Sequence, residues 1–189
     1  MSKANDFIAV DGWLSSINGQ LLTNLASDVI KDHCIVEVGT YRGKSAVALS
    51  AGAKEGVKIY TLNPFTEIRG INGGVFGRED RAAFYYFMLK TNAYKNVWSL
   101  QCTSRDVAST WREKIGLLYI DGDHSYEGVR EDIDLWIPHL VRGAMVIFDD
   151  MNMEGVKRAV EETIVRGQFV PIELGFVSPM KGFRFLGSC

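Results

Sequence analysis

Short apolar runs alternate along the chain with longer stretches in which apolar residues recur every three or four positions. Seven runs rich in β-branched and aromatic residues are predicted to be strands: residues 34–39, 58–63, 97–102, 115–122, 144–150, 169–175 and 182–187. The alternation is typical of a mostly parallel, doubly wound α/β sheet. The connection between the last two runs is too short for a crossover helix, so we expect a C-terminal antiparallel hairpin.

Helical periodicity fills the intervals between these runs. One predicted helix carries an apolar stripe at i, i+4, i+7 and i+11: Val129, Ile133, Trp136 and Leu140. Pro138 and Gly143 mark its end. Asn152 is placed to cap a later helix, whose stripe is Val156, Val160 and Ile164. We expect a leading helix within residues 12–31 to pack against the first strand.

Residues 64–80 are glycine-rich and have no clear period, which predicts a long loop beside the second strand. Ordered loops of this length are more often functional than idle, so we interpret this one as a substrate loop. The residues that follow, 82–90, are apolar on every side. They predict a helix buried in the core or against a substrate or a second subunit.

The composition indicates one domain, residues 1–189, because 47% of its 189 residues are hydrophobic. The formal net charge is −2 and there is no basic run, which argues against nucleic acid or an anionic membrane as a partner. We find neither a signal-peptide pattern nor a membrane-spanning run and expect a cytoplasmic protein. Cys34, Cys102 and Cys189 do not have disulfide or metal spacing, so we predict reduced thiols, the first two buried.

The glycine loop after the first strand, VGTYRGKSA, comes within one residue of a phosphate-binding loop. Gly39 and Gly43 enclose three residues before Lys44 and Ser45, where that loop needs four. Glu37 would also hold a carboxylate near the phosphates, and like charges repel strongly in a partly dry crevice. The pattern departs equally from the dinucleotide fingerprint, so a ligand with positive charge fits the loop better.

Acidic residues end the fourth and fifth predicted strands. Asp121 ends the fourth, and Asp149 and Asp150 end the fifth. Neighbouring strand ends lie about 4.8 Å apart, so three carboxylates can converge on one point. Such a cluster favours Mg²⁺, Mn²⁺ or Ca²⁺, although aspartates at these positions also serve as helix caps.

His124 follows Asp121 by three residues and lies at the carboxyl edge of the predicted sheet, where ligands bind in open α/β folds. A neutral imidazole there can take a proton from a substrate hydroxyl. The alternative is a histidine that hydrogen-bonds to the loop backbone. Asp123 and Tyr126 are candidate supports for it, whereas His33 and His139 are expected at the surface.

The segments CIVEVGTYRGKSA, KIYTLNPF, LLYIDGDHSYEGVREDIDLW and LVRGAMVIFDDM together resemble the class I S-adenosylmethionine-dependent methyltransferases. More narrowly, the chain is similar to the small-molecule O-methyltransferase branch that often needs a divalent metal. The resemblance covers residues 12–187 and is most specific at IDGDHSYEGV. It implies a single-domain, Rossmann-like methyltransferase fold.

The resemblance also implies a cofactor site in which Glu37, Gly39 and Gly43 line the methionine part of S-adenosylmethionine. The implied cofactor-binding residues are Glu37, Gly39, Thr40, Tyr41, Gly43, Ser45, Asn63, Thr103, Ser104 and Asp121. The family usually has an acid for the ribose hydroxyls where this chain has Asn63, which can accept one hydrogen bond and donate another. Thr103 and Ser104 occupy the place of adenine recognition, or cap a helix instead.

The function implied is methyl transfer to a hydroxyl of a small molecule, a sugar, a polyketide or a phenol. In the resembling enzymes the metal positions correspond to Asp121, Asp149 and Asp150, and His124 takes the place of the base. A homo-oligomer is possible. Two alternatives stay open: a P-loop-like NTPase that uses residues 39–45, and a non-catalytic cofactor-binding protein of the same fold.

Overall fold

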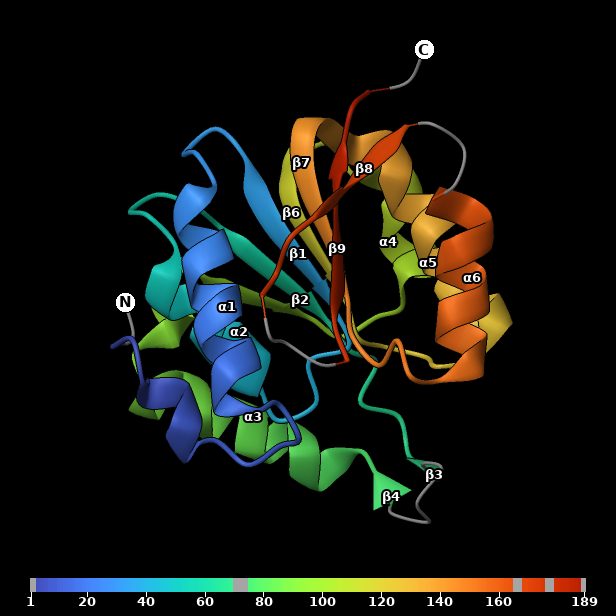
Figure 1. Cartoon of the computed structure of the whole chain (residues 1–189). Coiled ribbons are helices and arrows are strands. Elements are labelled where there is room, and N and C mark those ends of the chain that lie inside the picture. Colours follow the sequence, from blue (N-terminus) through green and yellow to red (C-terminus); the bar gives the residue numbers. More distant parts are fainter. Residues whose placement is uncertain (1–2, 70–74, 165–167, 176–178, 188–189) are drawn as a thin grey trace.

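The structure is a computed structural model that describes residues 3–69, 75–164, 168–175 and 179–187. Its centre is a seven-stranded sheet in the order β5-β2-β1-β6-β7-β9-β8 (Figure 1). The strands in this order are β5 (Val97–Leu100), β2 (Ile59–Leu62), β1 (Cys34–Val38), β6 (Ile115–Ile120), β7 (Leu140–Phe148), β9 (Lys181–Phe185) and β8 (Phe169–Ile172). The first five run parallel, and β9 pairs antiparallel with both β7 and β8. The predicted fold class is therefore confirmed.

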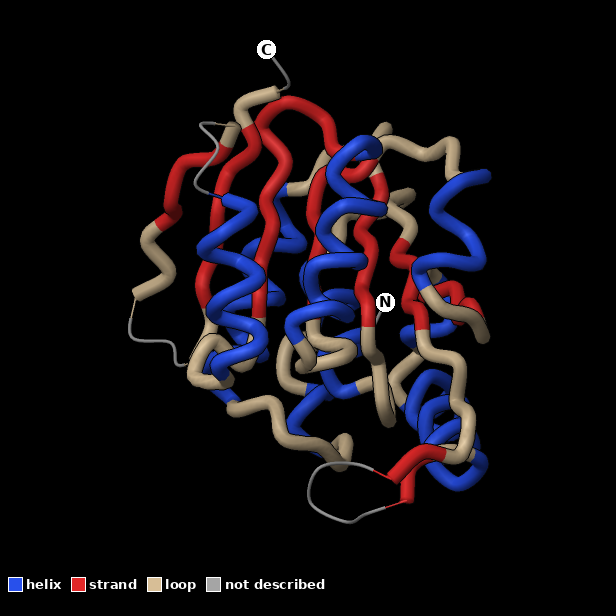
Figure 2. The backbone as a smooth tube through the Cα atoms, turned by 90° about the vertical axis from the view of Figure 1, so that its right-hand side faces the viewer, coloured by secondary structure: helices blue, strands red, loops and turns tan. Residues whose placement is uncertain are grey.

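Helices cover both faces of the sheet. One face carries η1 (Asp6–Ala9), α1 (Ser16–Asp28), α2 (Lys44–Gly52) and α3 (Arg78–Lys90). The other carries α4 (Ser104–Val107), α5 (Tyr126–Trp136) and α6 (Glu154–Ile164). Short 3-10 turns complete the described elements: η2 (Ala93–Lys95), η3 (Ala108–Thr110) and η4 (Ile137–His139). Figure 2, turned toward α6, shows helices lying across the front of the strands.

The alternation of side chains along each strand separates two hydrophobic cores. In β1, Ile35 belongs to the core under α1 and α2, whereas Cys34 and Val36 belong to the core under α5 and α6. All five residues of β1 are buried, as are all six of β6. Central parallel strands buried on both faces leave only their ends open to ligands.

The helix after the fourth strand is shorter than predicted. The α-helix α5 ends at Trp136 and Leu140 opens β7, so Leu140 is not part of the helical stripe. Pro138 explains the difference because proline lacks the N–H donor that an α-helix interior needs, and the chain continues there as the 3-10 turn η4. The next helix, α6, begins at Glu154, two residues after the predicted cap Asn152.

The leading helix forms as predicted, with the Ser15 hydroxyl accepting from the Asn18 N–H at its start. It packs chiefly on α2 rather than on the first strand, and the Thr23 hydroxyl donates to the Ala48 carbonyl 3.0 Å away. Cys34 is buried as expected, but Cys102 is only half-buried, so that prediction was wrong. Cys189 lies outside the described residues.

The predicted loop over residues 64–80 contains structure of its own. Two short strands, β3 (Ile68–Arg69) and β4 (Val75–Phe76), pair antiparallel, and α3 begins at Arg78. The helix α3 is not buried on every side. It packs three side chains into the core, Phe84, Phe87 and Met88, and exposes three others, Tyr85, Tyr86 and Leu89. Among the described residues, no helix is long and apolar enough to cross a membrane.

Candidate active site

The candidate site lies at the carboxyl edge of the sheet, where β1, β6 and β7 end side by side. Val38 pairs with Ile120, and Ile120 with Phe148, so the strands end in register. The Asp121 N–H donates to the Val38 carbonyl, which holds the first residue after β6 against the end of β1. This register brings the glycine loop and the acidic residues to one place.

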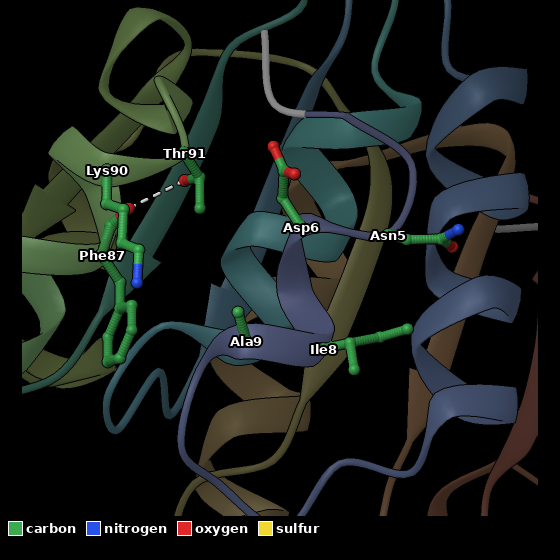
Figure 3. A pocket seen from close by; sticks show the side chains of 7 residues that line it. All are labelled: Asn5, Asp6, Ile8, Ala9, Phe87, Lys90 and Thr91. Atoms are coloured by element: carbon green, nitrogen blue, oxygen red, sulfur yellow. Dashed lines mark hydrogen bonds between the residues drawn. The ribbon is translucent and has the colours of Figure 1, made fainter.

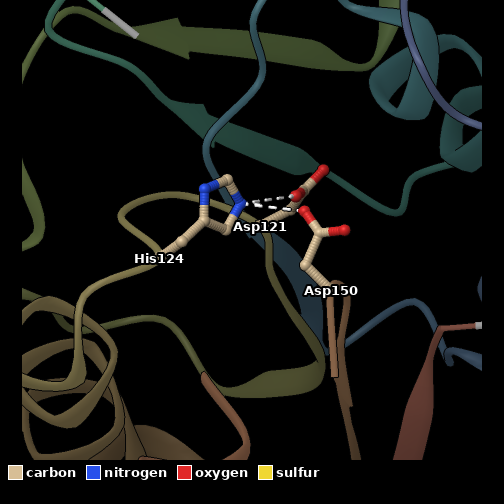
Figure 4. A group of neighbouring side chains, drawn as sticks. All are labelled: Asp121, His124 and Asp150. Carbon is tan, nitrogen blue, oxygen red and sulfur yellow. Dashed lines mark ion pairs between the residues drawn. The ribbon is translucent and has the colours of Figure 1, made fainter. Parts of the chain in front are cut away.

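Asp121, His124 and Asp150 point toward one another there (Figure 4). His124 Nε2 lies 2.9 Å from Asp150 Oδ2 and 3.8 Å from Asp121 Oδ1. One ligand atom from each of the three residues lies within 4.8 Å of the other two. Asp150 adopts a left-handed backbone with φ of 51°, which is unusual for a residue other than glycine and often marks a functional site.

Electrostatics couple these three groups. The pKa of His124 is raised, mainly by the Asp121 carboxylate, with Asp150 adding to the effect and burial opposing it. The pKa of Asp121 is raised to about 6, chiefly because burial removes water from its carboxylate. Protonation of His124 would place a positive charge beside the two carboxylates.

Asp149, the third predicted metal ligand, is buried and lies outside this group of three. Its Oδ2 accepts a 2.7 Å hydrogen bond from the Tyr119 hydroxyl, and its Oδ1 accepts from the Asp150 N–H. The Tyr119 oxygen also lies 3.1 Å from Asp121 Oδ2, so it joins the ends of β6 and β7. Of the three predicted metal ligands, Asp121 and Asp150 thus lie together with His124, and Asp149 contacts Tyr119 beside them.

Tyr119 was missed by the sequence prediction, and the two proposed supports of His124 act elsewhere. The Asp123 carboxylate accepts from the Ser125 N–H, and the Tyr126 hydroxyl donates to Glu162 2.6 Å away. Asp123 contributes only a smaller electrostatic effect that raises the pKa of His124, after Asp121 and Asp150.

Glu37 lies in the middle of the sheet, opposite Thr61 of β2 and Tyr119 of β6. Its side chain is fully buried, and within the described part of the chain neither carboxylate oxygen has a hydrogen-bond partner. The Thr40 and Thr61 hydroxyl oxygens are buried without partners as well. Desolvation raises the pKa of Glu37 to about 8, against the smaller opposing effect of the Ser45 and Thr40 hydroxyls.

Polar groups buried in this way are rare because each forfeits its hydrogen bonds to water. A positively charged group that also donates hydrogen bonds would satisfy the Glu37 carboxylate and the hydroxyls around it. A cation here would favour the ionised carboxylate and remove the penalty of burial.

Both glycines of the loop adopt positive φ, 86° at Gly39 and 88° at Gly43. A Cβ at Gly39 would lie 2.0 Å from the Asp121 carbonyl oxygen, and one at Gly43 would lie 2.7 Å from Met88. These glycines thus allow the loop to pack against the residue after β6 and against α3. The tight packing keeps the loop and the acidic group in contact.

The loop does not have the features of a triphosphate site. Lys44 Nζ donates to the Gly12 carbonyl oxygen 3.0 Å away, and Ser45 is buried within α2 near Glu37. The lysine that would contact phosphate is thus occupied by the protein itself, and the serine that would contact magnesium is buried.

The remaining predicted cofactor residues lie at the ends of β2 and β5. Asn63 Oδ1 accepts from the Phe65 N–H, which leaves its amide N–H groups to face a ligand. Thr103 caps α4 together with Asp106, as the alternative prediction had it. The Ser104 hydroxyl is buried and accepts from the Trp136 indole N–H, so it supports the core rather than the surface.

A separate hollow of about 420 Å³ lies between η1 and the end of α3 (Figure 3). Ile8 and Ala9 line one side of it, and Phe87, Lys90 and Thr91 line the other. None of the residues around Asp121 and Glu37 contributes to this hollow.

Comparison with known proteins places the chain in a family. The family model described as a methyltransferase domain matches residues 36–151, which include Glu37, the glycine loop, Asp121, Asp149 and Asp150. An uncharacterized protein of Acanthamoeba polyphaga mimivirus is 30% identical over 142 residues, 69% of this chain and 57% of that protein. The chain thus spans little more than half the length of this relative.

Solved structures show the same fold at low identity. The O-methyltransferase TomG from Streptomyces achromogenes, in complex with S-adenosylmethionine, has a TM-score of 0.72 and 16% identity, over 97% of this chain and 87% of that one. An O-methyltransferase from Bacillus cereus in complex with S-adenosylhomocysteine has a TM-score of 0.70 and 17% identity, over 95% of this chain and 84% of that one. Because its family model matches more than half of the sequence, the chain belongs to this methyltransferase domain family.

Proposed function

We propose that the chain is an S-adenosylmethionine-dependent O-methyltransferase that acts on a hydroxyl of a small molecule with the help of a divalent cation. The observation that carries the proposal is the buried Glu37 carboxylate without partners, which lies under the glycine loop beside Asp121. The cofactor's methionine part offers an ammonium for this surface. Related folds bind this cofactor or its product, as in the TomG and Bacillus cereus complexes.

The acidic group fits a divalent cation by its donor chemistry. Asp121 and Asp150 supply hard oxygen ligands of the kind that Mg²⁺ and Mn²⁺ prefer. Asp149 would orient the site through its hydrogen bond to Tyr119. When bound, S-adenosylmethionine would supply the methyl group and the cation would lower the pKa of the acceptor hydroxyl.

The role of His124 follows from its two carboxylate neighbours. With Asp121 and Asp150 unneutralised, Asp121 first and then Asp150 raise the pKa of His124, which favours the protonated imidazole. Neutralising the carboxylates would lower that pKa and favour the neutral imidazole. Nε2 can then accept the proton of the acceptor hydroxyl.

A methyl-transfer assay tests the proposal. The protein is incubated with S-adenosylmethionine labelled in the methyl group and a panel of sugar, polyketide and phenolic acceptors, with Mg²⁺ or with a chelator. We expect label in at least one acceptor with Mg²⁺, and a loss of about 100-fold or more in His124→Gln. His33→Gln is the matched control, because His33 precedes β1 at the opposite end of the sheet. Cofactor binding without transfer to any acceptor would favour the non-catalytic alternative.

A further inference from the structure

Three aromatic rings meet beside the glycine loop and form a surface that we call the aromatic ledge: Trp13, Tyr41 and Phe76. Trp13 stacks on Tyr41 with ring centroids 4.9 Å apart and planes inclined by 18°. Phe76 meets both rings edge to face, at 6.0 Å and 5.4 Å. The ledge joins segments that are far apart in sequence, because Trp13 precedes α1, Tyr41 belongs to the glycine loop and Phe76 to β4.

Polar contacts fix the N-terminal segment to the loop at this point. Arg42 pairs with Asp11 at 3.3 Å and with Asp80 of α3 at 2.9 Å. Lys44 donates to the Gly12 carbonyl oxygen. The two residues that precede Trp13 are thus both held by the glycine loop, and Trp13 itself stacks on Tyr41, so the position of this ring depends on the loop that would hold the cofactor.

Two features of the ledge are unfavourable for the protein alone. Trp13 is 74% exposed although its stacking partner covers one side, which leaves a large apolar surface in water. Tyr41 has a φ of 45°, a left-handed conformation that glycine or asparagine adopts more easily. Backbone strain of this kind is found at ligand sites, where the surrounding structure maintains it. Both features are explained if a ligand covers the ledge.

The ledge is close to the candidate active site. Tyr41 lies two residues after Gly39, so their Cα atoms are at most about 7 Å apart. Gly39 packs against the Asp121 carbonyl, and the Asp121 carboxylate lies beside His124. Figure 1 shows the segment before α1, the start of α2 and the β3–β4 pair at the same end of the sheet.

We propose that the aromatic ledge binds the ring of the methyl acceptor and that Trp13 determines which rings are accepted. The inference rests on the proposed function, because it names the acceptor class for that same site. An aromatic face stacks on a flat ring, either a phenol or the C–H face of a sugar. The Arg42 guanidinium, 5.1 Å from the Tyr41 centroid, is already paired with Asp11 and Asp80, so an uncharged ring is favoured.

Saturation-transfer NMR tests the ledge with two probes, catechol and methyl β-D-glucopyranoside, on protein saturated with S-adenosylhomocysteine. We expect one probe to bind the wild type and its affinity to fall about tenfold in Trp13→Ala, with a smaller loss in Trp13→Phe. Trp98→Ala is the matched control, because Trp98 is an exposed tryptophan on the edge strand β5 and should leave probe binding unchanged. The probe that binds assigns the acceptor to the phenols or to the sugars.

Two controls separate the ledge from the proposed function. S-adenosylhomocysteine is first titrated into each variant, and we expect Trp13→Ala to bind it within about twofold of the wild type, because the ledge contacts the acceptor. Failure of the wild type to bind this product would overturn the proposed function. Two results would overturn the proposed role of the ledge while leaving the proposed function intact, provided that the wild type binds S-adenosylhomocysteine. The first is that the wild type binds neither probe. The second is that Trp13→Ala binds the probes as tightly as the wild type does.

Discussion

Replacing Glu37 by glutamine removes an ionisable group from the middle of the sheet with little change in volume. In the free protein this carboxylate has no hydrogen-bond partner among the described residues, and burial raises its pKa from 4.5 to about 8. The folded state therefore holds the proton more tightly than the unfolded chain. Below pH 4.5 both states are protonated, and as the pH rises toward 8 the unfolded state loses its proton first, which destabilises the fold.

The size of the effect follows from the two pKa values. A rise from 4.5 to about 8 corresponds to roughly 5 kcal/mol in full, of which about 3.5 kcal/mol develops between pH 5 and pH 8. Glu37→Gln cannot ionise, so its free energy of unfolding should fall less over this range. The free energy of unfolding of the variant, relative to that of the wild type, should therefore rise by about 3.5 kcal/mol between pH 5 and pH 8. This is a large share of the stability of a typical domain.

Urea unfolding followed by circular dichroism at each pH measures this difference. Asp132→Asn is the matched control, because burial raises the pKa of Asp132 only to about 6, against the Ser104 hydroxyl, which lowers it. The free energy of unfolding of Asp132→Asn, relative to that of the wild type, should stop rising by about pH 7. That of Glu37→Gln should rise by about 1 kcal/mol more between pH 7 and pH 8. The reasoning is refuted if the difference between Glu37→Gln and the wild type is the same at pH 5 and pH 8.

Three further changes test other parts of the site. Gly39→Ala places a Cβ 2.0 Å from the Asp121 carbonyl oxygen, whereas Gly143 has a similar φ of 89° but open space around it. In urea unfolding, Gly39→Ala should therefore lower the free energy of unfolding by at least about 2 kcal/mol more than Gly143→Ala does. Equal losses of stability would argue against the clash. Asp121→Asn should lower the pKa of His124 in a proton NMR titration, because the Asp121 carboxylate is the largest cause of its rise. Asn63→Asp should bind S-adenosylhomocysteine about three- to tenfold more tightly by calorimetry, since a carboxylate accepts from both ribose hydroxyls; weaker binding would show that Asn63 does not face the ribose.

The positions of the strands and of the acidic residues were predictable because both depend on local pattern. Apolar runs define buried strands, and parallel neighbours end at one edge, so Asp121, Asp149 and Asp150 were expected close together. The alternation of side chains also contained information that the prediction did not use. Tyr119 pairs with Ile147, so Tyr119, Asp121 and Asp149 share one side of the sheet, and the Tyr119 hydroxyl contacts both carboxylates. Asp150 reaches Asp121 and His124 from the next position, with a left-handed backbone that the pattern did not indicate.

Contacts between distant loops could not be predicted in this way. The stacking of Trp13 on Tyr41 and the contact of both with Phe76 join three segments that have no shared periodicity. The end of α5 was a different case, since Pro138 was recognised but the apolar spacing was followed past it to Leu140. The α-helix ends there because Pro138 lacks a backbone N–H, although the apolar spacing continues to Leu140.

The central claim is that the glycine loop holds a sulfonium cofactor and not a triphosphate. Calorimetric titration of the metal-stripped protein with S-adenosylhomocysteine and, separately, with Mg-ATP tests it most directly. The account predicts binding of S-adenosylhomocysteine in the micromolar range and no heat with Mg-ATP, because the loop is one residue too short for a triphosphate and Lys44 is bound to the Gly12 carbonyl. Binding of Mg-ATP without binding of S-adenosylhomocysteine would contradict it.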